Sequence, residues 1–400
     1  MNILKKLSAV LGLALIGSLL MATIVMANVV PTENYNLIFN GERVVFDAEA
    51  PPVISNGSTL LPLRFLFDLL DQDGIGQLDW SPAYQQVSIT FGETTATLWI
   101  GEYDAVINDV NFPVTGAAPI LFNDLTYVPL RFLAETFDMT VGWDAPSRTA
   151  SAISNEKLDR ITYLIENNKP DDVEDFRMSV NMISTISMTQ TYDGEEETLS
   201  LKSEVTTRID LSEMFSHAHV IATNEGESMV IDRFDDGEWL YLSADDMVFK
   251  VPSLLAQVED IEALMMEFDA FASLELSREF YRTLRLEEVG AAYVVSGQVF
   301  ISNDIFIELI DAIGGLEGIL GDIRDMTIDI RSLNLRVSIN RVTGLLVSTE
   351  IQFVVDISTE FLGEIISVNV QMNVNASNFN FDPIFETVVP QEIIDDAIEV

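Results

Sequence analysis

The residues best suited to metal chemistry in this chain are His217 and His219, the only two histidines in 400 residues. They lie two apart, so on a β-strand both imidazoles point to one face and form a two-point clamp. A stable metal site needs a third and usually a fourth ligand. Glu225, Glu227 and Asp232 are near in sequence, but nothing in the sequence places them in space. We therefore interpret the histidines as ordinary strand residues and predict no metal site.

An acidic run, Asp71-Gln72-Asp73-Gly74, has the composition of a calcium-binding loop. With Gly74 at the sixth place of such a loop, Leu69 would be first and Trp80 twelfth, and neither can supply the required carboxylate. We predict an ordinary acidic turn. A calcium-binding surface protein stays as an alternative because the chain has 64 acidic residues.

Catalytic motifs are absent from the sequence. There is no cysteine, no G-x-S-x-G elbow and no phosphate-binding loop. Paired carboxylates could hydrolyse glycosides, and 64 acids offer too many pairs to single one out. We predict no catalytic residues and no cofactor, with a carboxylate-based hydrolase of cell-wall glycans as the alternative.

The charge balance limits the partners. A formal net charge of −43 repels phosphate backbones, which argues against nucleic-acid binding, and it disfavours anionic membrane surfaces. Hydrophobic residues make up 48% of the chain, which is enough to build cores.

Residues 1–27 have the pattern of a secretory signal peptide. Lys5 and Lys6 precede an apolar run, and Val25-Met26-Ala27 offers a small-residue cleavage pattern. The alternative is an uncleaved anchor, because the run is long enough to span a bilayer; the membrane would then be contacted only through this leader. We predict a secreted or cell-surface protein that relies on packing, since it has no disulfide. The oligomeric state stays open.

One phrase occurs twice. Leu60–Leu66 (Leu-Leu-Pro-Leu-Arg-Phe-Leu) returns at Tyr127–Leu133 (Tyr-Val-Pro-Leu-Arg-Phe-Leu), which indicates an internal repeat. Proline suits a helix start, so we predict helices from about Leu63 to Leu70 and from Leu130 to Phe137. Asparagine-led turns between apolar runs predict tight hairpins before each phrase. At Asn123-Asp124 the second repeat has aspartate where the first has glycine, and glycine is the residue that such a turn favours.

The polar and aromatic residues of the repeat are interpreted as structural. We expect the two arginines to bind backbone carbonyls or a carboxylate near their own helix starts, and the two tryptophans to anchor cores. The alternative is that the arginines grip an anionic envelope polymer and the tryptophans stack on sugars. The repeat signature consists of Pro62, Arg64, Trp80, Pro129, Arg131 and Trp143.

The doubled phrase and its Trp-containing turns resemble the copper amine oxidase N-terminal-like domain, over residues 35–154 with repeats at about 35–92 and 103–154. The resemblance implies an exported module typical of Gram-positive bacteria. It does not imply oxidase activity, because the copper site of the oxidases needs three imidazoles and this chain has two histidines. We predict that the protein is not an enzyme.

The remainder is predicted as a linker helix, 155–175, and a sheet domain, 176–390. From Arg177 onward apolar residues alternate with polar ones, which predicts long antiparallel strands with one wet face. Two helical segments interrupt them, one capped by Ser253 and one by Asp304. The expected fold class is α+β: a small duplicated β-hairpin/helix module, then a large antiparallel sheet, or half-barrel, with helices on one face.

This second half resembles the lipoprotein-carrier-like half-barrel, on the Asp236-Gly237-x-Trp239-x-Tyr241 strand, the order of elements and the closing long hairpin. The resemblance implies a concave apolar face that holds a lipid or another hydrophobic ligand. Trp239, Tyr241 and Tyr293 are the candidate ligand-binding residues, with core packing as the alternative. The expected function is an exported non-enzymatic cell-envelope protein whose partner is a hydrophobic ligand or a cell-wall polymer.

Overall fold

The computed structural model describes residues 30–31, 35–168, 177–192, 195–210, 212–224, 226–244, 247–253, 278–312, 327–361, 364–381 and 383–399. They form two compact units, one built around Val45–Asp138 and the other from Asn36–Val44 and Met139–Val400. The predicted leader, the acidic stretch 171–175, the helix after Ser253 and the glycines at 314–315 lie outside the described residues. No described helix is long and apolar enough to cross a membrane.

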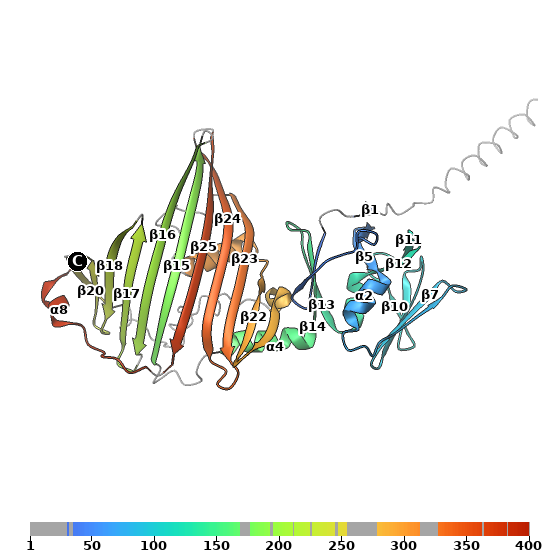
Figure 1. Ribbon diagram of the computed structural model, residues 1–400, viewed down its shortest axis with the longest axis horizontal. Coiled ribbons are helices and arrows are strands. Elements are labelled where there is room, and N and C mark those ends of the chain that lie inside the picture. Colours follow the sequence, from blue (N-terminus) through green and yellow to red (C-terminus); the bar gives the residue numbers. More distant parts are fainter. Residues whose placement is uncertain are drawn as a thin grey trace, which may run out of the picture. The chain divides into compact units, whose positions relative to one another are not determined.

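In the first unit the two Pro-Leu-Arg-Phe phrases lie side by side (Figure 1). Their strands, β5 (Ser58–Pro62) and β12 (Leu125–Pro129), pair antiparallel at the centre of the five-stranded sheet β1-β4-β5-β12-β11. The other strands are β1 (Val30–Pro31), β4 (Val53–Ser55) and β11 (Ile120–Phe122).

Each phrase is a transition from strand to helix. β5 ends at Pro62 and α2 spans Leu63–Leu70; β12 ends at Pro129 and α3 spans Leu130–Thr136. Proline has no N–H to lose at a helix start, so it ends the ladder and opens the helix at no hydrogen-bond cost. Both predicted helices are confirmed, the second ending one residue early.

A second five-stranded sheet, β10-β9-β8-β7-β6, packs against these helices within the unit. Phe91 of β7 stacks on Phe67 of α2 at 5.2 Å and meets Phe137 edge-on at 5.0 Å. The strands are β6 (Gln77–Ser81), β7 (Gln86–Phe91), β8 (Thr94–Trp99), β9 (Asp104–Ile107) and β10 (Val110–Pro113).

The hairpins turn at asparagines in the left-handed region. Asn40, Asn56, Asn108 and Asn123 have φ of 51°, 49°, 47° and 49°. Positive φ at both turn residues is the hairpin geometry that matches strand twist. Asp124, with φ of 61°, adopts it as well, so the replacement of glycine does not change this turn.

The second unit begins with a four-stranded sheet, β13-β14-β2-β3. β2 (Asn36–Phe39) runs parallel to β14 (Thr149–Ser154), while β3 (Glu42–Val44) and β13 (Met139–Asp144) flank them. Ser154 then caps α4 (Asn155–Glu166), its Oγ accepting from the Lys157 backbone N–H at 3.4 Å.

The largest element is a twelve-stranded sheet, open at both ends and antiparallel except for its last pair. Its longest strands lie at the centre (Figure 1). In spatial order the strands are β21 (Arg285–Val289), β22 (Ala292–Gln298), β23 (Thr327–Asn340), β24 (Leu346–Phe361), β25 (Glu364–Asn380), β15 (Arg177–Tyr192), β16 (Glu195–Asp210), β17 (Phe215–Asn224), β18 (Glu227–Asp235), β19 (Trp239–Ala244), β20 (Met247–Pro252) and β26 (Ala397–Glu399).

Three helical elements pack on one side of this sheet. α4, the 3-10 helix η2 (Arg278–Thr283) and α6 (Asn303–Ala312) bury Leu158, Tyr281 and Phe306 in the same cluster as Val337 and Phe353 of the strands. The predicted linker helix is therefore part of the core of the sheet domain. α6 is capped by Ser302, whose Oγ accepts from the Ile305 N–H at 3.4 Å, and not by Asp304 as expected.

The C-terminal helix departs from the expected plan. α8 (Gln391–Asp396) lies by β19 and β20, and Ile393 packs with Phe215, Phe234 and Tyr241. These side chains belong to the opposite side of the sheet from the α4 cluster, because they alternate with the residues of that cluster's side along their strands. Helices therefore cover both sides of the sheet, not one.

The turn of the β2–β3 hairpin packs against residues 284–285, and substitution of two matched turn glycines tests this contact. Gly41→Ala should destabilise the protein at least twice as much as Gly57→Ala. Both have positive φ, so each alanine costs about 1–2 kcal/mol. Only at Gly41 would the new Cβ lie 2.5 Å from the backbone of Arg285, whereas nothing lies within 4 Å at Gly57. Urea unfolding of both variants measures the difference, and equal losses would contradict the packing of this hairpin on residues 284–285.

Candidate functional site

One row of side chains across the twelve-stranded sheet, all on the same face, is apolar almost without interruption. The strand registers align one residue from each strand between β21 and β20, and every member of this row but one threonine is apolar. The row, here called the apolar row, is Leu286, Val295, Val337, Thr349, Ala376, Met182, Val205, Val220, Ile231, Ala244 and Met247. We call the side of the sheet that bears it the apolar face and the other side the polar face.

The described helices fill only one half of the apolar face. The α4 cluster reaches from β21 to β15, where Ile186 and Met188 are its last members. Farther along, apolar side chains of this face are exposed to solvent. They are Leu199 at 44%, Met229 at 46%, Leu242 at 38% and Met247 at 57%. This second half, β16 to β20, is the candidate binding surface.

The predicted ligand residues do not come together. Tyr293, on β22, lies near one end of the sheet, where its hydroxyl accepts from Arg160 at 2.9 Å. Trp239 and Tyr241, on β19, lie near the other end and on the polar face, alongside Phe234. Lys250 Nζ lies 4.2 Å from the Trp239 ring. Only Tyr293 shares a face with the candidate surface.

The repeat signature is more exposed than expected. Pro62 and Pro129 are buried, whereas Arg64 is exposed with its guanidinium 5.9 Å from the Phe67 ring. Arg131 pairs with Glu135 on its own helix at 3.1 Å, and both side chains are about half exposed. Trp80 and Trp143 are 41% and 44% exposed, so the prediction that they anchor cores is wrong. Each lies on an edge strand of its sheet, which leaves one side of that strand without a neighbouring strand.

Both histidines converge on one carboxylate on the polar face. His217 Nε2 and His219 Nδ1 lie 3.0 Å and 2.8 Å from the same oxygen, Oδ1 of Asp232. The His217 ring also stacks on Phe234 at 4.3 Å, and its Nδ1 faces Arg208 at 3.4 Å. Within the described ranges no group of three or more His, Cys, Asp or Glu residues is arranged to hold a metal ion. The acidic run is a closed turn, since Asp71 Oδ1 accepts from the Gly76 N–H at 2.7 Å.

The hydrogen bonds from the two histidines make the stability that Asp232 contributes depend on pH. Burial raises the pKa of the carboxyl, but hydrogen bonds and charge from His217 and His219 outweigh it and hold the pKa below its usual value. A lowered folded-state pKa stabilises the fold above the unfolded pKa, and this stability is lost as pH falls through the folded pKa. Asp232→Asn should therefore destabilise the protein at pH 7 by more than at pH 3.

Urea unfolding of the wild type and the variant at several pH values measures this difference in the free energy of unfolding. Asp79→Asn, at an exposed position on β6, is the control. A destabilisation by Asp232→Asn that stays constant from pH 7 to pH 3 would contradict the assigned role of the histidines.

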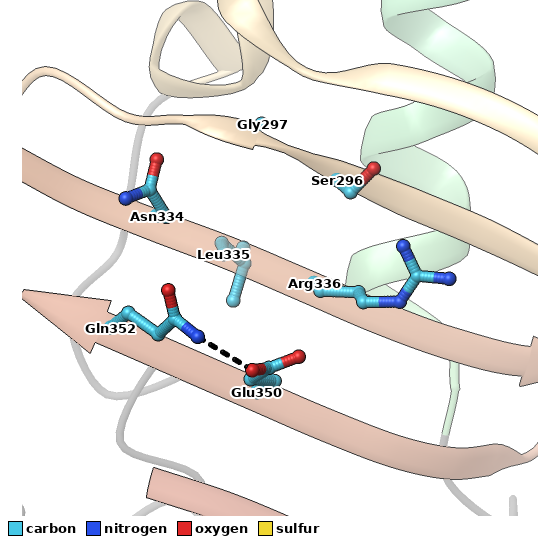
Figure 2. Close-up of a pocket in the computed structure, with 7 residues that line it drawn as sticks. All are labelled: Ser296, Gly297, Asn334, Leu335, Arg336, Glu350 and Gln352. Carbon is cyan, nitrogen blue, oxygen red and sulfur yellow. Dashed lines mark hydrogen bonds between the residues drawn. The ribbon is translucent and has the colours of Figure 1, made fainter. Parts of the chain in front are cut away.

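The polar face carries a shallow depression of about 200 Å³ over β22, β23 and β24 (Figure 2). Figure 2 shows Ser296 and Arg336 at one end and Asn334 and Gln352 at the other. Gln352 Nε2 donates to Glu350 Oε1 at 2.7 Å. The lining is mostly polar, and Arg336 and Gln352 are exposed, which suits a solvated face better than a ligand site. The full lining is Ser296, Gly297, Asn334, Leu335, Arg336, Glu350 and Gln352.

Residues 38–152 match the copper amine oxidase N-terminal domain, which confirms the resemblance predicted for residues 35–154. Residues 164–398 match DUF6612, a family of unknown function, and this match covers more than half of the 400 residues. The chain belongs to the DUF6612 family. The DUF6612 region contains the whole twelve-stranded sheet except Glu399. No curated protein matches the chain.

Three solved structures are similar at low identity. The YwiB protein from Bacillus subtilis is 8% identical with a TM-score of 0.14, covering 50% of this chain and 92% of its own. A domain from Vibrio parahaemolyticus described as an outer membrane lipoprotein-sorting protein is 10% identical with a TM-score of 0.16, covering 57% and 93%. A DUF1329 family protein from Desulfovibrio piger is 10% identical with a TM-score of 0.14, covering 57% and 92%.

The predicted resemblance to lipoprotein carriers thus has a counterpart among these structures. At such TM-scores the likeness assigns no binding surface to this chain.

Proposed function

We propose that this protein is an exported, non-enzymatic envelope protein that binds a hydrophobic ligand on the apolar face of its twelve-stranded sheet. The observation that carries the proposal is the apolar row, which continues from β15 to β20 beyond the last side chains of the α4 cluster. Exposed apolar surface of this extent marks an interaction site in soluble proteins more often than it is neutral.

The residue types on this surface suit a flexible apolar ligand. Methionines contribute at Met229 and Met247, and methionine side chains adapt to irregular apolar shapes because they are unbranched and polarisable. Valine and isoleucine fill the positions between them. Such a lining binds an acyl chain through the apolar area that is buried. Each CH₂ removed from water contributes about 0.8 kcal/mol of binding free energy.

The rest of the chain supports a location outside the cytoplasm. The sequence pattern of residues 1–27 predicts export, and the duplicated module would serve for interaction or anchoring at the envelope. Arg64 and Trp80 are exposed in that module, which leaves them accessible to a cell-wall polymer.

Binding of straight-chain alcohols of increasing length tests the proposal by calorimetry. The dissociation constant should fall by up to about fourfold for each added CH₂, as burial of about 0.8 kcal/mol per CH₂ requires. A dissociation constant that does not change with chain length would contradict a hydrophobic site.

Two adjacent residues of β18 provide a matched pair for locating the site. Ile231 belongs to the apolar row, while Val230 lies on the polar face and is 42% exposed. Ile231→Gln should weaken binding of 1-dodecanol about tenfold or more, since it puts an amide on the binding surface. Val230→Gln should leave the affinity unchanged, and equal effects of the two substitutions would place the site elsewhere.

A further inference from the structure

The second half of the apolar face carries a single arginine. Arg233 lies on β18 two residues from Ile231, and the registers pair it with Ala218 of β17 and Leu242 of β19. Its row continues through Thr207 to one side and Phe249 to the other. The cross-strand neighbours of Arg233 on its own face are therefore small or apolar.

Among the described residues Arg233 has no ion-pair or hydrogen-bond partner, although its side chain is half-buried. Asp235 is the acid nearest to it along the strand on the same face. Its Oδ1 instead accepts from Ser253 Oγ at 2.6 Å and from the Gly237 N–H at 3.1 Å. The chain has 64 acidic residues against 21 basic ones, so an unpaired cation in apolar surroundings is unexpected.

Desolvating a guanidinium without a counter-charge costs free energy, and a bound anion removes that cost. Guanidinium is planar and matches a carboxylate through two parallel N–H···O bonds. Among the described residues, Arg233 is the one cation on the second half of the apolar face, so it can balance one negative charge of a ligand. A ligand head with two negative charges would keep one of them unbalanced on a protein of net charge −43.

We propose that the ligand is a long-chain fatty acid, whose carboxylate pairs with Arg233 while its chain lies along the methionine and valine side chains of β16 to β18. The inference rests on the proposed function and deepens it by naming the ligand class. Binding is non-covalent, and the acid is held in its ionised form.

Calorimetry on the full-length protein with dodecanoate and 1-dodecanol separates the hydrophobic site from the recognition of a carboxylate. The two ligands have the same alkyl chain and differ only in the head group. Arg233→Gln should weaken dodecanoate binding about 10- to 100-fold, the range of a lost charge-assisted pair. It should leave 1-dodecanol binding unchanged. Arg336→Gln, on the polar face and exposed, is the matched control and should alter neither.

The outcomes are distinguishable. If neither ligand binds the wild type, the apolar face is not a site for a hydrophobic ligand, and both the proposed function and the fatty-acid assignment are overturned. If both bind and Arg233→Gln changes neither affinity, the hydrophobic site stands and the fatty-acid assignment is overturned. A stronger loss for lysophosphatidylglycerol than for dodecanoate would overturn the carboxylate in favour of a phosphate head.

Thermal unfolding of the ligand-free protein excludes a merely structural arginine. Arg233→Gln should leave the melting temperature equal or higher, because it removes an unpaired charge from an apolar surface. A marked decrease in the ligand-free melting temperature would show that Arg233 holds the fold and would overturn the proposal.

Discussion

The structure depends on the alternation of mostly apolar and mostly polar side chains along very long strands. A register of sixteen aligned pairs joins β15 to β16, and a one-residue slip would exchange the two faces along the whole hairpin. The central strands therefore commit the sheet to one apolar and one polar face. The helical elements α4, η2 and α6 cover the first of these, and they cover only the half from β21 to β15.

That constraint also explains the element between the two matched regions. α4 follows the last strand of the N-terminal match, but its buried residues Leu158, Ile161 and Leu164 belong to the core of the large sheet. η2 links the same core to the small sheet, where Arg282 Nε donates to Ser151 Oγ at 3.2 Å. The β2–β3 hairpin is fastened there as well, since Arg285 lies 3.5 Å from Glu42. The small sheet is thus continuous in packing with the DUF6612 region.

The local structure was predictable from the sequence where short-range chemistry decides it. Proline at 62 and 129 places two helix starts, and period-two alternation identifies β23, β24 and β25. Tertiary context decided the rest. Trp80 and Trp143 are on rim strands and so stay exposed, and Ser302 caps α6 because its hydroxyl reaches Ile305. Neither fact is readable from residue type.

The candidate site was predictable in kind but not in position. The aromatic residues Trp239 and Tyr241 stood out by type, yet pairing with Pro252 and Lys250 puts them on the polar face. The stronger signal was the alternation Met229, Ile231, Arg233, in which a cation occupies an apolar position. Recognising it requires the registers of β18 against β17 and β19, because only the pairing shows that its cross-strand partners, Ala218 and Leu242, carry no counter-charge.

Photo-crosslinking tests the central claim most directly. A fatty acid with a diazirine at the end of its chain, bound to the full protein and irradiated, labels the side chains that it touches, and peptide mass spectrometry locates them. The account predicts labels on apolar-face positions of β16 to β18, such as Val205, Val220 and Ile231, and none at their polar-face neighbours Ile221 and Val230. Labels on the polar face, or equally on both faces, would contradict it.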